Sequence, residues 1–204
     1  MKNVLLIVFA AALVVAAFSC KGGDGRDGKQ KEAEKFDFRK AIWGMNHEEV
    51  KASESTTPTG DRPELITYRG DFDGIPAIVG YLFERDKLVR GGYLMQSSYE
   101  DPKNYISDYD SIKKGLIKDY GSPAQDDMVW NEGEEASDPA KYGESVCSGK
   151  LRFSTMWSDG RTVIRETLDG EGGICKQGII FESLEMYVNP AAEKNKAPES
   201  SPAP

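Results

Sequence analysis

Residues 75–98 read IPAIVGYLFERDKLVRGGYLMQSS, and this stretch decides the fold class. Apolar side chains recur at every second position on both sides of the ERDK tetrapeptide, for example at Ala77 and Tyr81 before it and at Val89 and Tyr93 after it. A period of two is that of a half-buried β-strand, and a short polar connection is typical of a tight turn. We therefore predict two adjacent antiparallel strands.

The same alternation recurs along the chain on both sides of this stretch. The predicted strands cover residues 64–70, 75–85, 86–98, 125–131, 150–158, 161–169 and 178–188. Gly80, Gly91 and Gly92 fall inside two of them, which indicates either bulges or a close approach of another element. The sequence thus predicts an antiparallel meander followed later by a second group of strands.

Two segments show helical signals instead. In residues 46–54, Asn46 is followed three positions later by Glu49, the spacing of a capping box. Residues 101–121 begin with Asp-Pro, end at Gly121 and carry an apolar stripe at helical spacing, which predicts a helix lying on a sheet. The fold class is therefore α+β: an antiparallel sheet with two helices packed on one face, in the order of a tandem α-βββ and α-ββββ duplication. The repetition is one of element order and not of residue identity.

The first 19 residues have the form of a secretory signal peptide. Lys2 is their only charge, and Val4 to Phe18 is an unbroken apolar run. As a helix this run spans about 22 Å, which is shorter than the roughly 30 Å of a bilayer core. We therefore predict that this segment is cleaved off and does not remain as a transmembrane anchor.

The sequence AFSC at residues 17–20 places small residues on both sides of Phe18 and a cysteine directly after the expected cut. Ordinary signal peptidase would accept this bond. The same four residues resemble the lipobox of bacterial lipoproteins, although Ala17 replaces the usual leucine. That resemblance implies lipidation of Cys20, and several acyl chains give stable membrane anchoring where a single chain is marginal. Lys21 in place of aspartate favours the outer membrane over the inner one.

Composition divides the remainder into three parts. Residues 20–35 carry much glycine and charge without apolar periodicity, which predicts a lipidated cysteine followed by a flexible tether. Residues 189–204 read as a disordered tail. Residues 36–188 are long enough for one domain with its own core.

Charge and cysteine count restrict the classes of partner. The chain has a net charge of −8, and loss of Lys2 with the signal makes it −9, so a general electrostatic attraction to nucleic acid is excluded. Cys147 and Cys175 remain after cleavage at Cys20. In an oxidising compartment they predict one disulfide, while free buried thiols and metal binding are the alternatives.

No pattern of catalytic residues is present, so we expect no enzyme, cofactor or metal site. His47 is the only histidine and follows a helix cap, where we expect it to be exposed. Asp71 and Asp73 have calcium-like spacing, but the further ligands of an EF-hand loop are missing, so this segment is interpreted as a turn. The three tryptophans could line a ligand cleft, although core packing is the simpler interpretation.

An acidic stretch follows the second predicted helix. It contains six carboxylates before any basic residue: Asp126, Asp127, Glu132, Glu134, Glu135 and Asp138. The simple interpretation is a solvated loop. The functional one is a docking surface for a basic partner or for divalent cations.

Four segments carry a resemblance to a known family: WGMNHEEV at 43–50, the Y-x-G strand at 68–70, the stretch at 79–95, and the helix ending DYGSP at 119–123. Together they resemble uncharacterised bacterial envelope lipoproteins with a WGM-x-x-x-E-V opening. More remotely they are similar to small lipoproteins of outer-membrane assembly and to the β-lactamase-inhibitor-like fold. The resemblance covers roughly residues 36–131 and brings no catalytic residues.

From these observations we expect a lipid-anchored, periplasm-facing module that binds another envelope protein without catalysis. The alternatives are a small-ligand or hydrolase-inhibitor-type binding protein, which would use the face around Trp130 and Trp157, and an envelope hydrolase whose site the sequence does not reveal. A pocket lined by tryptophans would favour the small-ligand alternative, and an open sheet face would favour protein binding.

Overall fold

The structure is a computed structural model that describes residues 36–131, 133 and 138–186. The expected signal peptide (1–19), the lipidated Cys20 with its tether (20–35) and the expected tail (189–204) lie outside the described residues. No helix of the described part is long and apolar enough to cross a membrane.

The described residues form two blocks, each of which begins with a helix and continues with four strands. The first block contains α1 (His47–Ser53), β1 (Gly60–Arg62), β2 (Leu65–Phe72), β3 (Ile75–Glu84) and β4 (Lys87–Met95). The second contains α2 (Lys103–Tyr120), β5 (Gln125–Trp130), the 3-10 helix η1 (Pro139–Lys141), α3 (Tyr142–Cys147), β6 (Leu151–Ser158), β7 (Thr162–Glu171) and β8 (Ile174–Ser183).

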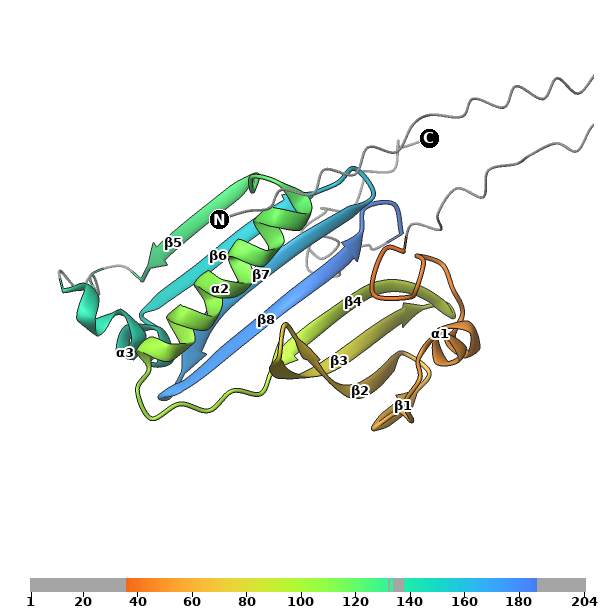
Figure 1. Cartoon of the computed structure of the whole chain (residues 1–204), viewed down its shortest axis with the longest axis horizontal. Coiled ribbons are helices and arrows are strands. Elements are labelled where there is room, and N and C mark those ends of the chain that lie inside the picture. Colours follow the sequence, from red (N-terminus) through yellow and green to blue (C-terminus); the bar gives the residue numbers. More distant parts are fainter. Residues whose placement is uncertain (1–35, 132, 134–137, 187–204) are drawn as a thin grey trace, which may run out of the picture. The chain divides into compact units, whose positions relative to one another are not determined.

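All eight strands form one antiparallel sheet in the order β1-β2-β3-β4-β8-β7-β6-β5. Each block contributes a helix followed by a four-stranded meander, and the last strands of the two meanders, β4 and β8, pair at the centre (Figure 1). The predicted α+β class with an antiparallel sheet is confirmed. The first block has four strands and not the predicted three, because the short strand β1 was missed, and in the second block η1 and α3 lie between β5 and β6.

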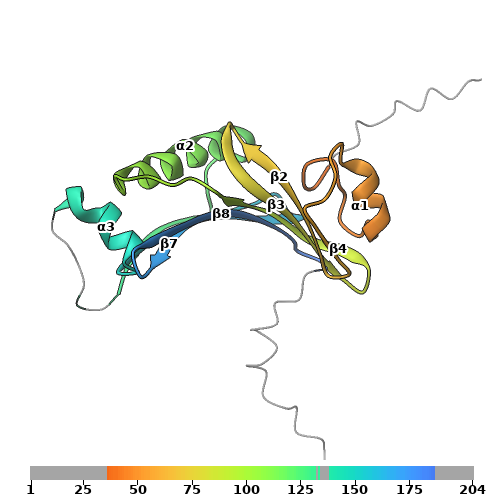
Figure 2. The same cartoon turned by 90° about the horizontal axis from the view of Figure 1, so that it is seen from below.

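The helices cover one face of the sheet. Figure 2 shows α2 and α3 on the same side of the curved sheet, and both contact β6, β7 and β8. On that face the strands carry the core residues Tyr68, Val79, Tyr81, Ile164 and Ile179, each at most 1% exposed. The predicted packing of two helices on one face holds, and α3 adds a third helix that the sequence analysis missed.

Local sequence signals explain where the helices begin and end. The Asn46 side chain accepts a hydrogen bond from the Glu49 amide at 2.9 Å and the Glu49 carboxylate accepts one from the Asn46 amide at 2.8 Å, which is the predicted capping box. Helix α2 starts at Lys103, whose amide donates to the Asp101 carboxylate. Its last residue, Tyr120, is followed by the cap Gly121, whose φ of 79° is unfavourable for a residue with a side chain.

The strand boundaries differ from the prediction by up to five residues, and the largest differences are at the two ends of β8. β8 begins at Ile174 and not at residue 178, so Cys175 lies inside the strand opposite Gly170. Its last residue is Ser183, because the chain turns at Leu184, whose amide donates to the Arg161 carbonyl. Alternation alone does not show where a strand stops, since a turn is fixed by hydrogen bonds to residues distant in sequence.

Candidate functional site

The face of the sheet opposite the helices carries the strongest candidate for a binding site. The residues on this face alternate with the core residues, so Ile78, Leu82, Leu94 and Ile180 point away from the helices. They are half-buried or exposed, and Leu94 is 50% exposed. No helix of the described residues lies on this side, which carries aliphatic residues on β2, β3, β4 and β8, and we call it the uncovered face.

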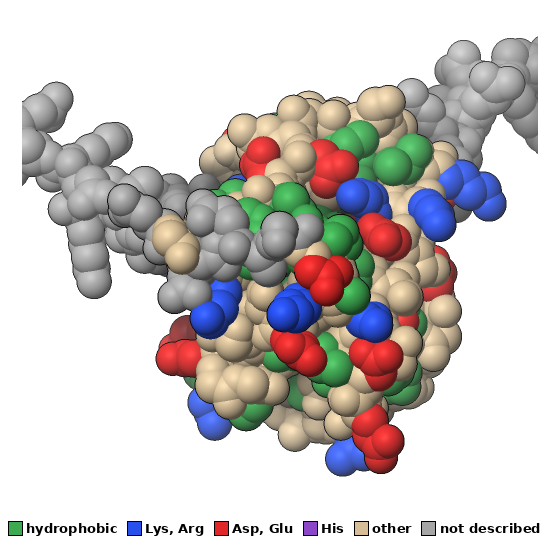
Figure 3. All heavy atoms as spheres, turned by 90° about the vertical axis from the view of Figure 1, so that its left-hand side faces the viewer, with side chains coloured by type: hydrophobic (Ala, Val, Ile, Leu, Met, Phe, Trp, Pro, Cys, Tyr) green, Lys and Arg blue, Asp and Glu red, His purple; other side chains and the backbone are tan. Residues whose placement is uncertain are grey.

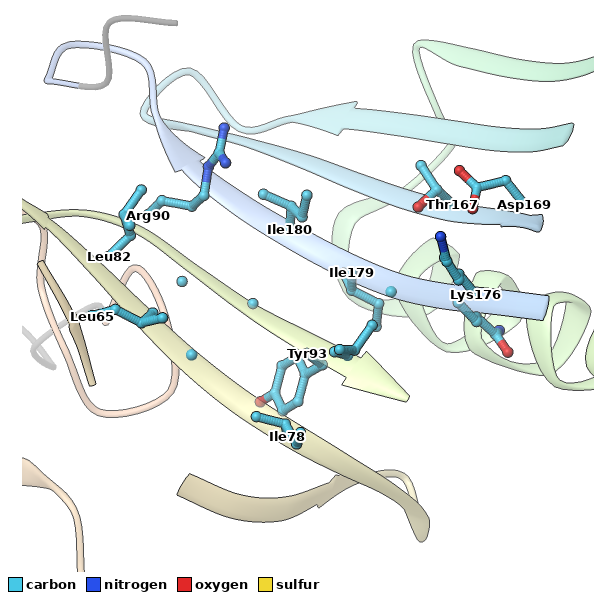
Figure 4. Close-up of a pocket in the computed structure, with 16 residues that line it drawn as sticks. Leu65, Ile78, Leu82, Arg90, Tyr93, Thr167, Asp169, Lys176, Ile179 and Ile180 are labelled. Atoms are coloured by element: carbon cyan, nitrogen blue, oxygen red, sulfur yellow. The ribbon is translucent and has the colours of Figure 1, made fainter. Parts of the chain in front are cut away.

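A groove of about 380 Å³ runs over the uncovered face at the centre of the sheet (Figure 4). Gly80 on β3 is directly opposite Gly92 on β4, and Gly178 on β8 is opposite Leu94. Because three neighbouring strands lack side chains there, the backbone forms the floor. The walls are aliphatic and consist of Leu65, Ile78, Leu82, Leu94 and Ile180.

The three glycines of the groove floor differ in whether backbone packing requires them. A Cβ on Gly92 would lie 2.7 Å from the Ile179 carbonyl oxygen, and one on Gly178 would lie 3.0 Å from the Tyr93 carbonyl oxygen, so close backbone packing accounts for both. A Cβ on Gly80 would meet only the Leu65 side chain, at 3.7 Å, which is an ordinary contact. Packing therefore does not require glycine at position 80, and its effect is to keep the groove open.

Charged side chains mark the two ends of the groove. At one end Arg90 forms an ion pair with Glu182 on the neighbouring strand. At the other end Asp169 and Lys176 are cross-strand neighbours on β7 and β8. The groove is thus apolar in its middle and polar at its ends, a distribution that suits an aliphatic chain and offers no activated nucleophile.

The tryptophans do not line this groove. Trp157 is 1% exposed in the core and donates its Nε1 hydrogen to the Gly121 carbonyl at 3.0 Å. Trp43 donates to the Thr162 hydroxyl at 2.9 Å. Trp130 packs edge-on against Tyr142. The groove could not be predicted from the sequence, because its signal is a set of glycines at matching positions of strands distant in sequence, and the match depends on the register between those strands.

The described acidic residues that were expected to form one docking surface lie in different surroundings. Asp126 lies 3.2 Å from the Lys113 ammonium and accepts a hydrogen bond from Thr155 at 2.8 Å, while Asp127 lies on the opposite face of β5. Asp138 accepts from the Ala140 amide and caps η1. The other three acids, Glu132, Glu134 and Glu135, lie outside the described residues. On the side where α3 lies, acidic and basic side chains are interspersed (Figure 3).

A buried acid on the covered face escaped the sequence analysis. Glu166 is 0% exposed, and burial raises the pKa of its carboxyl group to about 9, with Asp110 adding to the rise and Lys113 opposing it. Its neighbour across the strands is Thr155, whose hydroxyl contacts the Tyr109 hydroxyl at 2.5 Å. The signal was available, because Glu166 has the same parity as the apolar Ile164 and Leu168.

The remaining candidates have structural roles. Cys147 and Cys175 form a disulfide with their Cα atoms 4.3 Å apart, as expected. The Asp71 carboxylate accepts from the Gly74 amide within a turn. His47 is half-buried and not exposed as expected, because its ring lies 3.0 Å from Asp61 and packs on Phe83. The described residues contain no group of three or more metal-ligating side chains.

Comparisons with protein-family models, with curated proteins and with solved structures give no match to this chain.

Proposed function

We propose that this chain is a lipid-anchored, periplasm-facing envelope protein that acts by binding another envelope protein and not by catalysis. The observation that carries the proposal is the aliphatic, glycine-floored groove on the uncovered face of the sheet. The signal-like residues 1–19 and the lipobox-like AFSC support the location, with Cys20 as the lipidated residue and the outer membrane favoured.

The side chains of the uncovered face support binding. A contiguous exposed apolar surface is unfavourable for an isolated domain and marks sites of interaction. Leu65 and Leu94 line the groove and contribute exposed apolar area, with 37% and 50% of each residue exposed. Aliphatic side chains of an extended partner segment would fill the space above Gly80 and Gly92 and remove this surface from water. Burial of apolar area would contribute about 25 cal/mol per Å² to such a complex, and this gain is offset in part by the freedom that the two partners lose on association.

A small apolar ligand, such as an acyl chain, is the second candidate occupant. A groove of about 380 Å³ lies within the size range of small-ligand sites, and its aliphatic walls fit a hydrocarbon chain as well as they fit side chains. A protein of the hydrolase-inhibitor type would use the same groove to bind an enzyme instead of a small ligand. The envelope hydrolase is the third, and no described residue is assigned to it.

Photo-crosslinking in the native envelope tests the proposal and separates the occupants. A photoreactive amino acid at position 94, on the wall of the groove, should capture an envelope protein that mass spectrometry then identifies. The same group at position 118, on the exposed side of α2, serves as the control and should not capture it. Capture of lipid alone would mean that the groove binds an acyl chain, the second candidate, and not a protein.

A groove-filling variant gives the matched control for specificity. Gly80→Val adds a β-branched side chain where a Cβ meets no backbone atom, so the domain should fold while the groove is blocked. Ser154→Val places the same valine side chain on the same face of the sheet, on β6 and outside the groove lining. Loss of the crosslink in Gly80→Val but not in Ser154→Val is expected. Equal capture by both variants would reject the groove as the binding site.

A further inference from the structure

We infer that the outer edge of β5 accepts an extended, basic segment of a partner protein as a ninth strand of the sheet. The inference rests on the proposed function only in that the ligand is a protein, and it concerns a surface separate from the groove. β5 is the last strand of the sheet and pairs with β6 alone (Figure 1).

The backbone of β5 presents a row of hydrogen-bonding groups on this edge. The Asn131 amide donates to the Lys150 carbonyl at 2.9 Å, which fixes which residues face β6. In an antiparallel pair these residues alternate with residues whose N–H and C=O point outward. The outward-facing residues of β5 are therefore Asp126, Met128 and Trp130, and no described residue forms a hydrogen bond with their outward groups.

The opposite edge of the sheet is protected. β1 has only three residues, and α1 lies against it. The Asp61 carboxylate is 3.0 Å from both the His47 ring and the Lys51 ammonium, and His47 Nε2 lies 3.1 Å from the Arg62 carbonyl oxygen. Short length and a covering helix are ordinary protections of a sheet edge. β5 has six residues, and no helix of the described part covers its outer edge, so strand addition is expected there.

The side chains of β5 indicate the composition of the added strand. Met128 and Val129 point to opposite faces and are 47% and 43% exposed, so apolar residues beside them would be buried on both faces. Asp127 is exposed and makes no ion pair within the described residues, whereas Asp126 is already paired with Lys113. A lysine or arginine opposite Asp127 would neutralise the uncompensated carboxylate.

Charge argues against a second copy of the chain as the added strand. Two β5 strands side by side would bring together four aspartates from positions 126 and 127, and each chain carries a net charge of −8. Like charges on neighbouring strands are unfavourable, so these acids repel another β5 while they attract a basic strand. The edge is thus selective for a partner segment that alternates basic and apolar residues.

The experiment uses two ten-residue peptides with blocked ends, one alternating lysine with valine and one alternating glutamate with valine. Fluorescence anisotropy measures their affinity for the mature chain, and amide hydrogen exchange reports the contact. The lysine peptide should bind at least tenfold more tightly than the glutamate peptide. It should also slow exchange at the amides of Asp126, Met128 and Trp130.

Two substitutions separate backbone pairing from charge. Met128→Pro removes one outward N–H without touching the bonds to β6, and Met128→Thr keeps that N–H and is the matched control. At least tenfold weaker binding is expected for the proline variant and little change for threonine, with folding checked by circular dichroism. Asp127→Lys leaves the backbone unchanged and should reverse the preference between the peptides, so the inference is tested even if the proline variant does not fold.

Other outcomes would overturn the inference. Binding without protection of the three outward amides would mean attraction by charge alone. Protection that appears without peptide as the protein concentration rises would identify a second copy as the added strand. The groove variant Gly80→Val should bind the lysine peptide normally. Failure of the groove crosslink and failure of strand addition can therefore be told apart.

Discussion

The carboxyl group of Glu166 lies beside the side-chain amide of Gln177 on adjacent strands beneath α2, and both residues are buried. Neither side chain makes a hydrogen bond of normal geometry with a described residue. A buried carboxylate without partners is costly, so the group is kept in its neutral form. The stability of the packing at the centre of the covered face therefore depends on protonation of the Glu166 carboxyl group.

This proton gives the domain a pH dependence of known sign. The pKa of Glu166 rises from 4.5 to about 9 on folding, so the folded state binds the proton more tightly than the unfolded state. The stabilisation is fully present below pH 4.5 and is lost as the pH rises towards 9, by up to about 1.4 kcal/mol per pH unit.

Glu166→Gln should remove this dependence, because an amide does not titrate. We expect the variant to be more stable at pH 8 by up to about 5 kcal/mol, which is the loss that the wild type accumulates between pH 4.5 and pH 8, and to show a flatter stability profile between pH 5 and pH 9. Urea unfolding across that range measures it. Glu171→Gln, at an exposed site, is the control and should follow the wild type. A parallel decline in Glu166→Gln and wild type would contradict the assignment.

Alanine substitutions at two floor glycines should have opposite effects on stability. In Gly92→Ala the new methyl group meets the Ile179 carbonyl oxygen at 2.7 Å, which should destabilise the domain by about 1–3 kcal/mol. In Gly80→Ala it meets only a flexible leucine, and the lower entropy of the unfolded chain should stabilise by up to about 1 kcal/mol. Thermal unfolding of both variants measures the two effects. Equal changes in stability would show that backbone packing does not distinguish the two glycines.

Loss of the disulfide should destabilise the domain without changing the fold of its sheet. Cys147 and Cys175 are 28 residues apart, and closing a loop of that size contributes about 3–4 kcal/mol in the chain-entropy model. Cys147→Ser with Cys175→Ser should lower the urea midpoint accordingly. Wild type under reducing conditions should match the double variant. If reduction leaves the wild-type midpoint unchanged, the cross-link has no stabilising role.

The cap of α1 should contribute measurably because both halves of the capping box are formed. Asn46→Ala removes the acceptor for the Glu49 amide and should cost about 1 kcal/mol. Asn46→Ser keeps an acceptor and should cost a few tenths of that value. Chemical unfolding of the three proteins gives the comparison, and indistinguishable midpoints would mean that α1 is held by its tertiary contacts and not by its cap.

Lipidation at Cys20 is tested in cells. Cys20→Ser should move the protein from the membrane fraction to the soluble periplasmic fraction, since the acyl chains would be absent. Intact-mass measurement of the wild type should show the mass of the attached lipid. A variant that stays in the washed membrane fraction, together with a wild type of unmodified mass, would refute the lipid anchor.

The sequence by itself determined the local elements of this protein. The period of two around Tyr81 and Tyr93, the Asn46 cap and the Gly121 stop each depend on neighbours within a few residues, so the pattern predicts them directly. The Cys147–Cys175 pair was also predictable, because no other cysteine follows Cys20. β1 and α3 were missed because three to six residues carry too little periodicity to be recognised.

Only the tertiary structure decided what the two faces and edges of the sheet present. The groove exists because β4 pairs with β8, which places Gly92 beside Ile180 although 88 positions separate them in the sequence. Register between distant strands is set by packing of the whole core, and a shift of one residue would exchange the two faces. The free edge of β5 likewise follows from strand order. The local sequence specifies a strand, but its neighbours determine whether that strand is buried, paired or open to a partner.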